Sequence, residues 1–295
     1  MSNAIQRKQH LVAYVFILPF FAVFAAMLVA PLVYSGYLSL FVDRLIGGVS
    51  FVAFENYLRA FQDSAFLEGL GRTALILVIQ VPIMLGLALF FALALDSGLA
   101  RGSKALRLLI FLPYAVPGVV AVLMWGYLYG QQFGLVGQIT GALGLPKTNL
   151  LSDDLILFSI MNIITWAFVG YNMIVMYSAL KSIPAELYEA AEIDGASQWR
   201  LAWSVKIPLI RPAILLTVIF SIIGSFQIFN EPKLLVEIAP TGITQGFTPN
   251  FYAFNLAFVN QDVNYAAAIA FLLGIVIMIV SYVVQLTTQR REFPS

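Results

Sequence analysis

The sequence is poor in the residues on which many protein classes depend. Among its 295 residues there is no cysteine and only one histidine, His10. The chain therefore has no disulfide framework, no thiolate metal site and no histidine cluster for zinc. Charged residues make up 11% of the chain, against roughly a quarter in soluble domains. With a formal net charge of +1, the protein is not expected to bind a nucleic acid.

Hydrophobic residues, in contrast, make up 61% of the chain and are grouped in long runs. A helix needs ~20 apolar residues to cross a bilayer. The first run contains Pro19 and Pro31 and exceeds this length, and the third is interrupted by Pro113 and Pro117. We predict an all-α membrane protein with six transmembrane helices, at residues 11–40, 73–95, 106–129, 155–180, 213–229 and 266–286.

The pattern also predicts how the chain is divided. Residues 1–70 form an N-terminal cytoplasmic stub, the first helix and an external segment, in which an amphipathic helix is expected within 42–72. Residues 71–290 form the transmembrane core with a loop at 182–212, and 291–295 form a tail. Eleven of the sixteen Lys and Arg residues fall on the side of the termini. Both termini are therefore expected in the cytoplasm.

The predicted spans carry almost no ionisable residues, which are the usual mark of ion pathways and proton relays. Glu231 and Lys233 are expected just beyond the end of the fifth span, at the outer interface. The phosphate-binding pattern GxxxxGK[ST] is absent, as are paired acids and a serine nucleophile elbow. The chain is therefore expected to be no enzyme, to bind no cofactor or metal, and to receive its energy from another protein.

Uncharged polar and aromatic residues do occur within the spans. Phe168 and Tyr171 share one face of the fourth span, and Ser221 and Ser225 share one face of the fifth. Hydroxyl groups and aromatic faces suit a neutral, polyhydroxylated solute, so these residues are candidates for a solute pathway. The alternative is that they only hold neighbouring helices together, as polar residues often do in membranes.

The loop at 182–212 reads as two helices. Ser182 can cap the first, Pro184 suits its opening turn, and Gly195 supplies the left-handed residue that ends it. A second helix is expected from about Ser197 to near Ile207, because Pro208 disfavours helical geometry in the residue before it.

Two tryptophans, Trp199 and Trp203, lie one turn apart on the second helix of this loop. They could rest on the membrane surface, as amphipathic helices do. The first helix, however, carries Glu186 and Glu189, which anionic lipid headgroups would repel. A basic protein surface is therefore the favoured partner of the loop.

The stretch EAAEIDGASQWRLAWSVKIPLIRP within this loop resembles the EAA loop of permeases from bacterial ABC importers. That pattern is E-A-A, two residues, D-G-A, and then an apolar helix that ends in L-P. The matching residues here are Glu189, Ala190, Ala191, Asp194, Gly195, Ala196 and Pro208. The resemblance implies that the loop forms coupling helices that seat in a cleft of a cytoplasmic ATPase subunit.

Other segments are similar to the carbohydrate-uptake branch, in particular the first permease of maltose- and glycerol-phosphate-type importers. These are FVAFENYLRAF, in which Ala53 and Phe54 depart from the pattern, LPYAVPGVVAVLMWGYLY and GSFQIFNEPKLL. The resemblance implies a type I ABC importer permease fold in a prokaryotic cell membrane, with Phe168, Tyr171, Ser221 and Ser225 near the sugar site. The implied partners are a second permease, a dimer of ATPases that holds ATP and Mg²⁺, and an extracytoplasmic solute-binding protein.

The expected function is that of a permease subunit that imports a sugar or a polyol-like solute. Two alternatives stay open at this point. One is another ABC importer branch, for amino acids, peptides or phosphate. The other is an ion-coupled carrier or a membrane scaffold.

Overall fold

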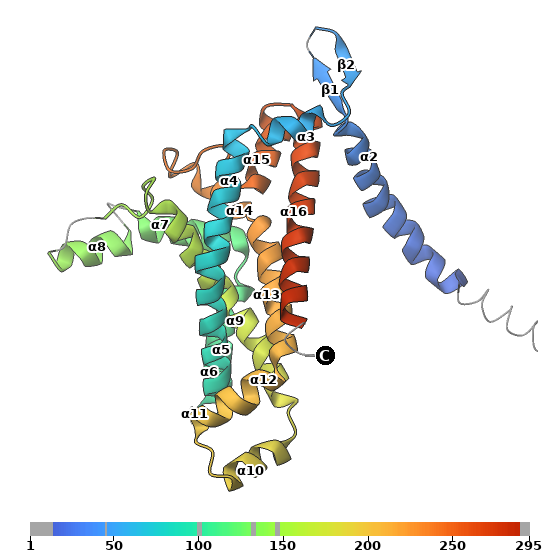
Figure 1. The fold of residues 1–295 in the computed structure, drawn as a ribbon. Coiled ribbons are helices and arrows are strands. Elements are labelled where there is room, and N and C mark those ends of the chain that lie inside the picture. Colours follow the sequence, from blue (N-terminus) through green and yellow to red (C-terminus); the bar gives the residue numbers. More distant parts are fainter. Residues whose placement is uncertain (1–13, 45, 99–101, 131–133, 145–147, 290–295) are drawn as a thin grey trace, which may run out of the picture. The chain divides into compact units, whose positions relative to one another are not determined.

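The computed structural model describes residues 14–44, 46–98, 102–130, 134–144 and 148–289 (Figure 1). The expected tail at 291–295 and the first 13 residues of the expected stub lie outside these ranges. Contacts divide the chain into two compact units. The first comprises Met1–Asp63 and Ala253–Leu272, and the second comprises Ser64–Tyr252 and Leu273–Ser295. The boundaries fall after Asp63, after Tyr252 and within the last helix, α16 (Val263–Gln289).

The first unit opens with the apolar helix Tyr14–Leu38, close to the expected span at 11–40. It contains a wide π turn, η1 (Ala25–Val29), followed by α2 (Ala30–Leu38). The π turn directly precedes Pro31, whose ring would crowd the carbonyl oxygen one regular turn earlier. None of the helix's most apolar window is buried by the chain itself. Its side chains are therefore free to contact lipid or another protein.

A β-hairpin follows, which the sequence analysis did not predict. Strands β1 (Phe41–Arg44) and β2 (Gly48–Phe51) pair antiparallel, with Phe41 opposite Phe51. Gly47 and Gly48 both have positive φ angles, which a tight hairpin turn requires. The helix expected within 42–72 is present, but it follows this hairpin, which was not predicted. Helical structure begins only at α3 (Glu55–Ala60).

Asn56 of the FENY segment joins α3 to the base of the hairpin. Its side chain is 1% exposed, and its amide donates hydrogen bonds to the carbonyl oxygens of Ser39 and Phe41, both at 2.9 Å. The hydroxyl groups of Tyr57 and Ser39 lie 2.7 Å apart. The same unit includes η4 (Asn255–Val259) and the start of α16, which is joined to α3 by an ion pair of 3.0 Å between Arg59 and Asp262.

Ala53, one of the two departures from the family pattern, has a φ of 48°. The left-handed region costs an alanine about 1 kcal/mol, and glycine adopts it freely. We predict that Ala53→Gly raises the unfolding temperature of the purified protein. The matched control is Ala60→Gly, which places glycine inside α3 and should lower that temperature. A lower temperature for both variants would contradict the prediction.

The second unit is built around two long apolar helices. The first is continuous over Ser64–Asp96 and consists of α4 (Ser64–Leu75), η2 (Ile76–Gln80) and α5 (Val81–Asp96). The expected second span began at 73, so the helix starts nine residues earlier than predicted. The other is α9 (Ile156–Lys181), which matches the expected fourth span. These helices pack along each other, with Met84, Ala88, Met173 and Met176 buried between them.

The expected third span is broken rather than straight. It consists of α6 (Ser103–Ala115) and α7 (Gly118–Tyr129), which meet at an angle of 94°. Val116 is extended, with a ψ of 129°, because the ring of Pro117 disfavours a helical conformation in the residue before it. Pro113 stays within α6, so Pro117 is the proline at which the span breaks.

The remaining helices of the second unit complete the core. Residues 135–142 form α8 (Leu135–Ala142), and α13 (Arg211–Phe226) is followed by α14 (Asn230–Leu235), which packs on α7. The loop at 182–212 contains α10 (Ala185–Ile193), α11 (Gln198–Leu201), η3 (Ala202–Lys206) and α12 (Ile207–Leu209). A unit boundary falls within α15 (Pro249–Phe254). In the described residues, five helices can span a membrane, or six with the bent pair. The predicted helical membrane fold is confirmed, and the hairpin is an addition to it.

Gly170 on α9 allows α6 to pack closely against α9. A Cβ atom at this position would lie 2.1 Å from the carbonyl oxygen of Ile110. Since that neighbour is backbone, it cannot rotate away, and the two helices would have to separate. The close contact of α6 with α9 therefore requires glycine at this position.

We predict that Gly170→Ala lowers the free energy of unfolding by about 2 kcal/mol, the usual cost of overpacking a core. The control is Gly86→Ala on α5, where an added Cβ meets nothing within 4 Å. That variant should keep or slightly raise stability, because alanine favours a helix. Unfolding of both purified variants measures the difference, and equal effects would show that the α6–α9 contact tolerates a wider spacing.

Candidate coupling and solute sites

The loop at 182–212 begins differently from the prediction. Ser182 does not cap the first helix of the loop; it ends α9, and its hydroxyl donates to the carbonyl oxygen of Ala179 at 2.7 Å. Helix α10 starts at Ala185, directly after Pro184. Because α9 runs to Lys181, Ser182 is needed at that helix's end and is too early in the chain to cap the next one.

The turn between the two helices is as predicted. Gly195 has a φ of 76°, and the amide of Ala196 donates to the carbonyl oxygen of Ala191 at 2.9 Å, which closes α10 with a Schellman-type end. The hydroxyl of Ser197 accepts a hydrogen bond from the amide of Arg200 and so caps the second helix. The predictions for Gly195 and for a helix start near Ser197 are confirmed.

The second helix was predicted to end near Ile207, before Pro208; it includes Pro208 and ends two residues further, at Leu209. The five residues of η3, Ala202–Lys206, form a wide π turn just ahead of Pro208. The amide of Ile207 donates a hydrogen bond to the carbonyl oxygen of Ala202. A wide turn places the preceding carbonyl groups away from the proline ring, so Pro208 is accommodated in the helix. The helix breaks at Ile210, and Pro212 then occupies the first turn of α13.

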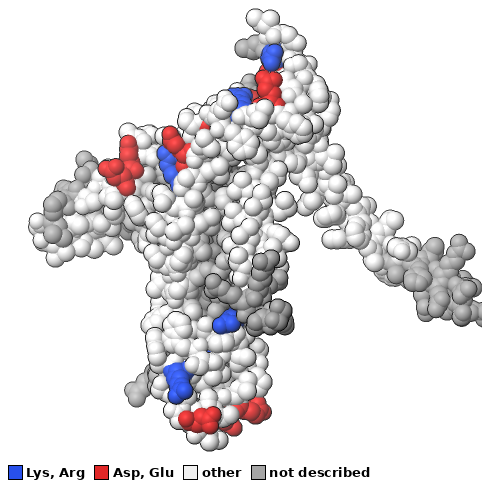
Figure 2. Space-filling view, viewed as in Figure 1, with Lys and Arg blue, Asp and Glu red and all other residues white. Residues whose placement is uncertain are grey.

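The family-motif residues lie on the outside of this loop. Glu189, Ala190, Asp194 and Gly195 are exposed. Ala191, Ala196 and Pro208 are partly buried. Figure 2 shows the acidic side chains gathered at the tip that α10 forms, where Glu186, Glu189 and Asp194 are exposed.

The two tryptophans of the loop are also uncovered by the chain. Trp199 is 74% exposed and Trp203 is 56% exposed, and their rings lie 5.8 Å apart. No residue of α10 whose side chain is described is buried. The described residues of the loop thus leave acidic, small and aromatic side chains exposed.

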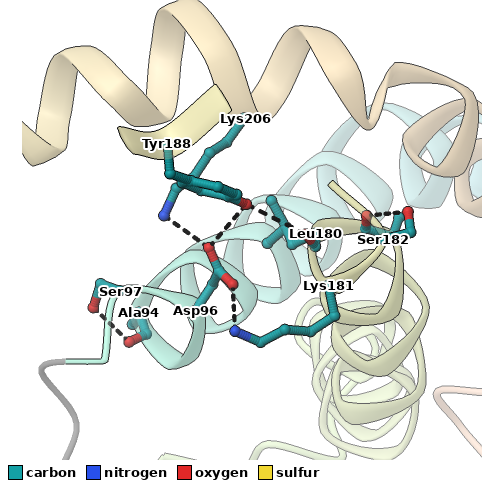
Figure 3. A network of polar contacts seen from close by, with 9 residues as sticks. Ala94, Asp96, Ser97, Leu180, Lys181, Ser182, Tyr188 and Lys206 are labelled. Carbon is teal, nitrogen blue, oxygen red and sulfur yellow. Dashed lines mark hydrogen bonds and ion pairs between the residues drawn. The ribbon is translucent and has the colours of Figure 1, made fainter. Parts of the chain in front are cut away.

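One buried carboxylate holds the loop on the core. Asp96, at the end of α5, accepts from Lys206 of η3 at 2.7 Å and from Lys181 of α9 at 2.9 Å (Figure 3). The side chains of Asp96 and Lys206 are 4% and 5% exposed, whereas Lys181 is half exposed. Three elements that are distant in sequence thus meet at one charge.

Tyr188 of α10 completes this cluster, which we call the Asp96 cluster (Asp96, Lys181, Tyr188 and Lys206). Its hydroxyl donates toward Asp96 at 3.5 Å and toward the carbonyl oxygen of Leu180 at 3.3 Å, and the Lys206 ammonium lies 4.9 Å from its ring centre. Burial, together with the negative charge of Asp96, raises the pKa of Tyr188 to about 12. The phenol therefore stays protonated at physiological pH and remains a hydrogen-bond donor.

Sequence reasoning did not single out any member of the Asp96 cluster. Asp96 is the only acid between the second and third expected spans, and Lys206 lies among apolar residues of the second loop helix. An isolated acid and an isolated base in two such loops are a signal for a pair, because buried charges are rarely left alone. That signal does not indicate that Lys181 and Tyr188 join the pair, nor does it give the distances between them.

We predict that Asp96→Asn lowers the free energy of unfolding by about 3 kcal/mol, because it leaves the Lys206 ammonium buried without its counter-charge. The double variant Asp96→Asn/Lys206→Met removes both charges and should recover much of this loss. The control Glu68→Gln breaks an exposed pair with Arg72 and should have little effect. If the double variant were less stable than Asp96→Asn, the pair would not be the source of the loss.

A cavity of about 290 Å³ lies in the second unit, among η2, α5, α9, α13 and α14. All four residues predicted for the solute pathway line it: Phe168, Tyr171, Ser221 and Ser225. Two aromatic rings thus face the cavity from α9 and two serines from α13. The ring of Tyr114 stacks on Tyr171 at 4.9 Å and fixes its orientation.

The cavity has further polar lining that the sequence analysis did not assign to it. Amide groups come from Gln80, Asn172, Gln227 and Asn230. Gln80 donates to the hydroxyl of Thr165 at 3.1 Å, and Asn172 donates to the carbonyl oxygen of Phe168 at 3.0 Å. The Ser225 hydroxyl donates to the carbonyl oxygen of Ser221, so its oxygen can still accept a hydrogen bond from a ligand.

Glu231 also lines this cavity, which differs from the expected place beyond the fifth span. The apolar segment continues through the break after Phe226 to Leu235 and includes Glu231. A turn over residues 227–229 redirects the chain, so that the first turn of α14 lies beside the cavity.

The chain matches a family of known transport proteins over nearly its whole length. It belongs to the family of binding-protein-dependent transport system inner membrane components, whose sequence profile matches residues 10–292. The protein is thus a multi-pass membrane permease subunit of an ABC importer, and in such systems the ATPase is a separate subunit.

Individual relatives agree with this assignment. The chain is 31% identical over 287 residues to the lactose transport system permease protein LacF of Rhizobium radiobacter, covering 95% of both chains. It is 30% identical to the diacetylchitobiose uptake system permease protein NgcF of Streptomyces coelicolor, over 81% of this chain and 71% of that protein. A chain of a bacterial alginate ABC transporter, crystallised with an alginate-bound periplasmic protein, has the same fold, with a TM-score of 0.84, 18% identity and 96% of each chain covered.

Proposed function

We propose that this chain carries a sugar or a related polyol-like solute and forms half of the translocation pathway. The observation that supports this most is the cavity, which combines aromatic faces with serine hydroxyl and amide groups. Such a lining offers stacking surfaces and hydrogen bonds to a neutral, hydroxyl-rich ring. The named relatives that transport lactose and diacetylchitobiose support the same solute class.

We further propose that the loop at 182–212 couples this pathway to a dimer of cytoplasmic ATPases, which hold the ATP and Mg²⁺. The exposed acidic tip and the exposed tryptophans are a surface suited to docking on a protein with basic groups. On the opposite side, the Asp96 cluster ties the loop to α5 and α9. A displacement of the loop would therefore be passed to the helices that line the cavity.

The proposed assembly also includes a second permease and an extracytoplasmic solute-binding protein. The uncovered apolar side chains of the helix Tyr14–Leu38 leave room for contacts with a second permease or with lipid. Both termini are proposed to face the cytoplasm of a prokaryotic cell, on the side of the coupling loop, since eleven of sixteen basic residues fall on that side.

We predict that Glu189→Lys and Gly195→Pro each abolish solute uptake while the protein still inserts into the membrane. Reversing the charge at Glu189 opposes docking, and proline cannot adopt the φ of 76° that Gly195 has. Uptake of radiolabelled disaccharides into cells, with membrane content measured by immunoblotting, tests both.

The matched control is Glu237→Lys, the same charge reversal at an exposed residue outside the loop. This variant should keep uptake near the level of the unmodified protein. Full uptake by both loop variants, with ATP hydrolysis still coupled to transport, would contradict the coupling role.

A further inference from the structure

Glu231 is the only charged residue among the side chains described as lining the solute cavity. The other lining residues are apolar, aromatic, hydroxyl or amide residues, and no lysine or arginine is among them. Glu231 stands at the start of α14, in the same cavity as Tyr171 and Ser221. The cavity lining thus contains one carboxyl group and no lysine or arginine.

No cation of the described chain neutralises this carboxylate. The ion pairs within the described residues join Arg59, Arg72, Lys181 and Lys206 to acids other than Glu231. The interaction found for the Glu231 carboxylate is a hydrogen bond from its own backbone amide. A carboxylate has two oxygens and accepts about four hydrogen bonds. Most of this capacity therefore remains for a ligand in the cavity.

A carboxyl group in a mostly apolar cavity is ionised at least cost when a ligand donates hydrogen bonds to it. Two neighbouring hydroxyl groups on a sugar ring match its two oxygens, because each hydroxyl can donate one hydrogen bond. Gln227 and Asn230 stand on either side of the same turn and can bind the remaining ring oxygens. A carboxylate group on the solute, in contrast, would meet a like charge at short range.

We propose that Glu231 is a specificity-determining residue of the cavity that selects neutral saccharides, through a pair of adjacent hydroxyls, against acidic saccharides. This inference rests on the proposed sugar permease function and defines the charge of its substrate class. Selection here is separate from selection by a solute-binding protein, because it acts on the solute within the membrane pathway.

The test uses the transporter purified with its second permease and ATPase subunits but without its solute-binding protein, so that binding reports the cavity alone. Thermal shifts are titrated with neutral di- to pentasaccharides (maltose and cellulose series) and with oligogalacturonates of the same lengths. In the unmodified transporter, a neutral oligosaccharide should raise the unfolding temperature and the oligogalacturonates should not.

Glu231→Gln keeps the shape and one acceptor oxygen but removes the charge. It should weaken binding of the neutral ligand about tenfold. Oligogalacturonate should then bind to this variant at about the same concentration as the neutral ligand does. The control Glu237→Gln removes an exposed carboxylate six residues further on and should change neither titration. An amino-sugar oligomer is titrated as well, and preferential binding of this cationic ligand would overturn the choice of a neutral substrate.

The outcomes separate this inference from the function on which it rests. If the unmodified transporter responded to no saccharide, the proposed sugar function would fail and the inference would fail with it. If neutral saccharides bound to the unmodified protein and Glu231→Gln left the preference unchanged, the sugar function would stand and only the role of Glu231 would be overturned.

Discussion

The position of the loop at 182–212 depends on the Asp96 carboxylate. It is the point at which α5, α9 and the second helix of the loop are joined, with Lys181 and Lys206 bonded to its two oxygens. Burying such a pair gives little net stability, because both charges lose their hydration. It does, however, specify geometry strongly, since any shift of Lys206 away from Asp96 leaves a buried charge without a partner. The cluster therefore fixes where the loop lies rather than how tightly the chain folds.

This arrangement gives the loop two different faces. Tyr188 and Lys206 hold the inner face against the membrane helices, while the acidic tip and the tryptophans remain uncovered by the chain. The helices to which the loop is tied also line the polar cavity of the second unit, because α5 contributes Met84 and α9 contributes Phe168, Tyr171 and Asn172. A force applied to the outer face thus has a direct path, through the two ion pairs of Asp96 and the helices α5 and α9, to the cavity walls.

The sequence was informative where the signal is local or periodic. Long apolar runs predicted the spans, the E-A-A and D-G-A spacing identified the loop, and Gly195 predicted the turn. It was misleading where a local preference was overruled by a wider turn or a neighbouring element: Pro208 lies in a π-distorted helix, and Ser182 ends α9. The hairpin around Gly47 was not predicted, although the glycine pair is a local signal for a turn. The Asp96 cluster and the place of Glu231 depend on contacts between residues far apart in the chain, which spacing alone does not show.

The central claim, that the loop moves as one body with the membrane helices, can be tested by distance measurement. The chain has no cysteine, so cysteines introduced at Lys104 on α6 and Arg200 on α11, both exposed, can carry spin labels without background. Pulsed electron paramagnetic resonance on the assembled transporter should give one narrow distribution of the distance between the two labels. This distribution should be the same without nucleotide and with trapped ATP, and Asp96→Asn should broaden it. A distribution in the unmodified protein that shifts or broadens when ATP binds would show that the loop moves independently of the helices, and would contradict the account.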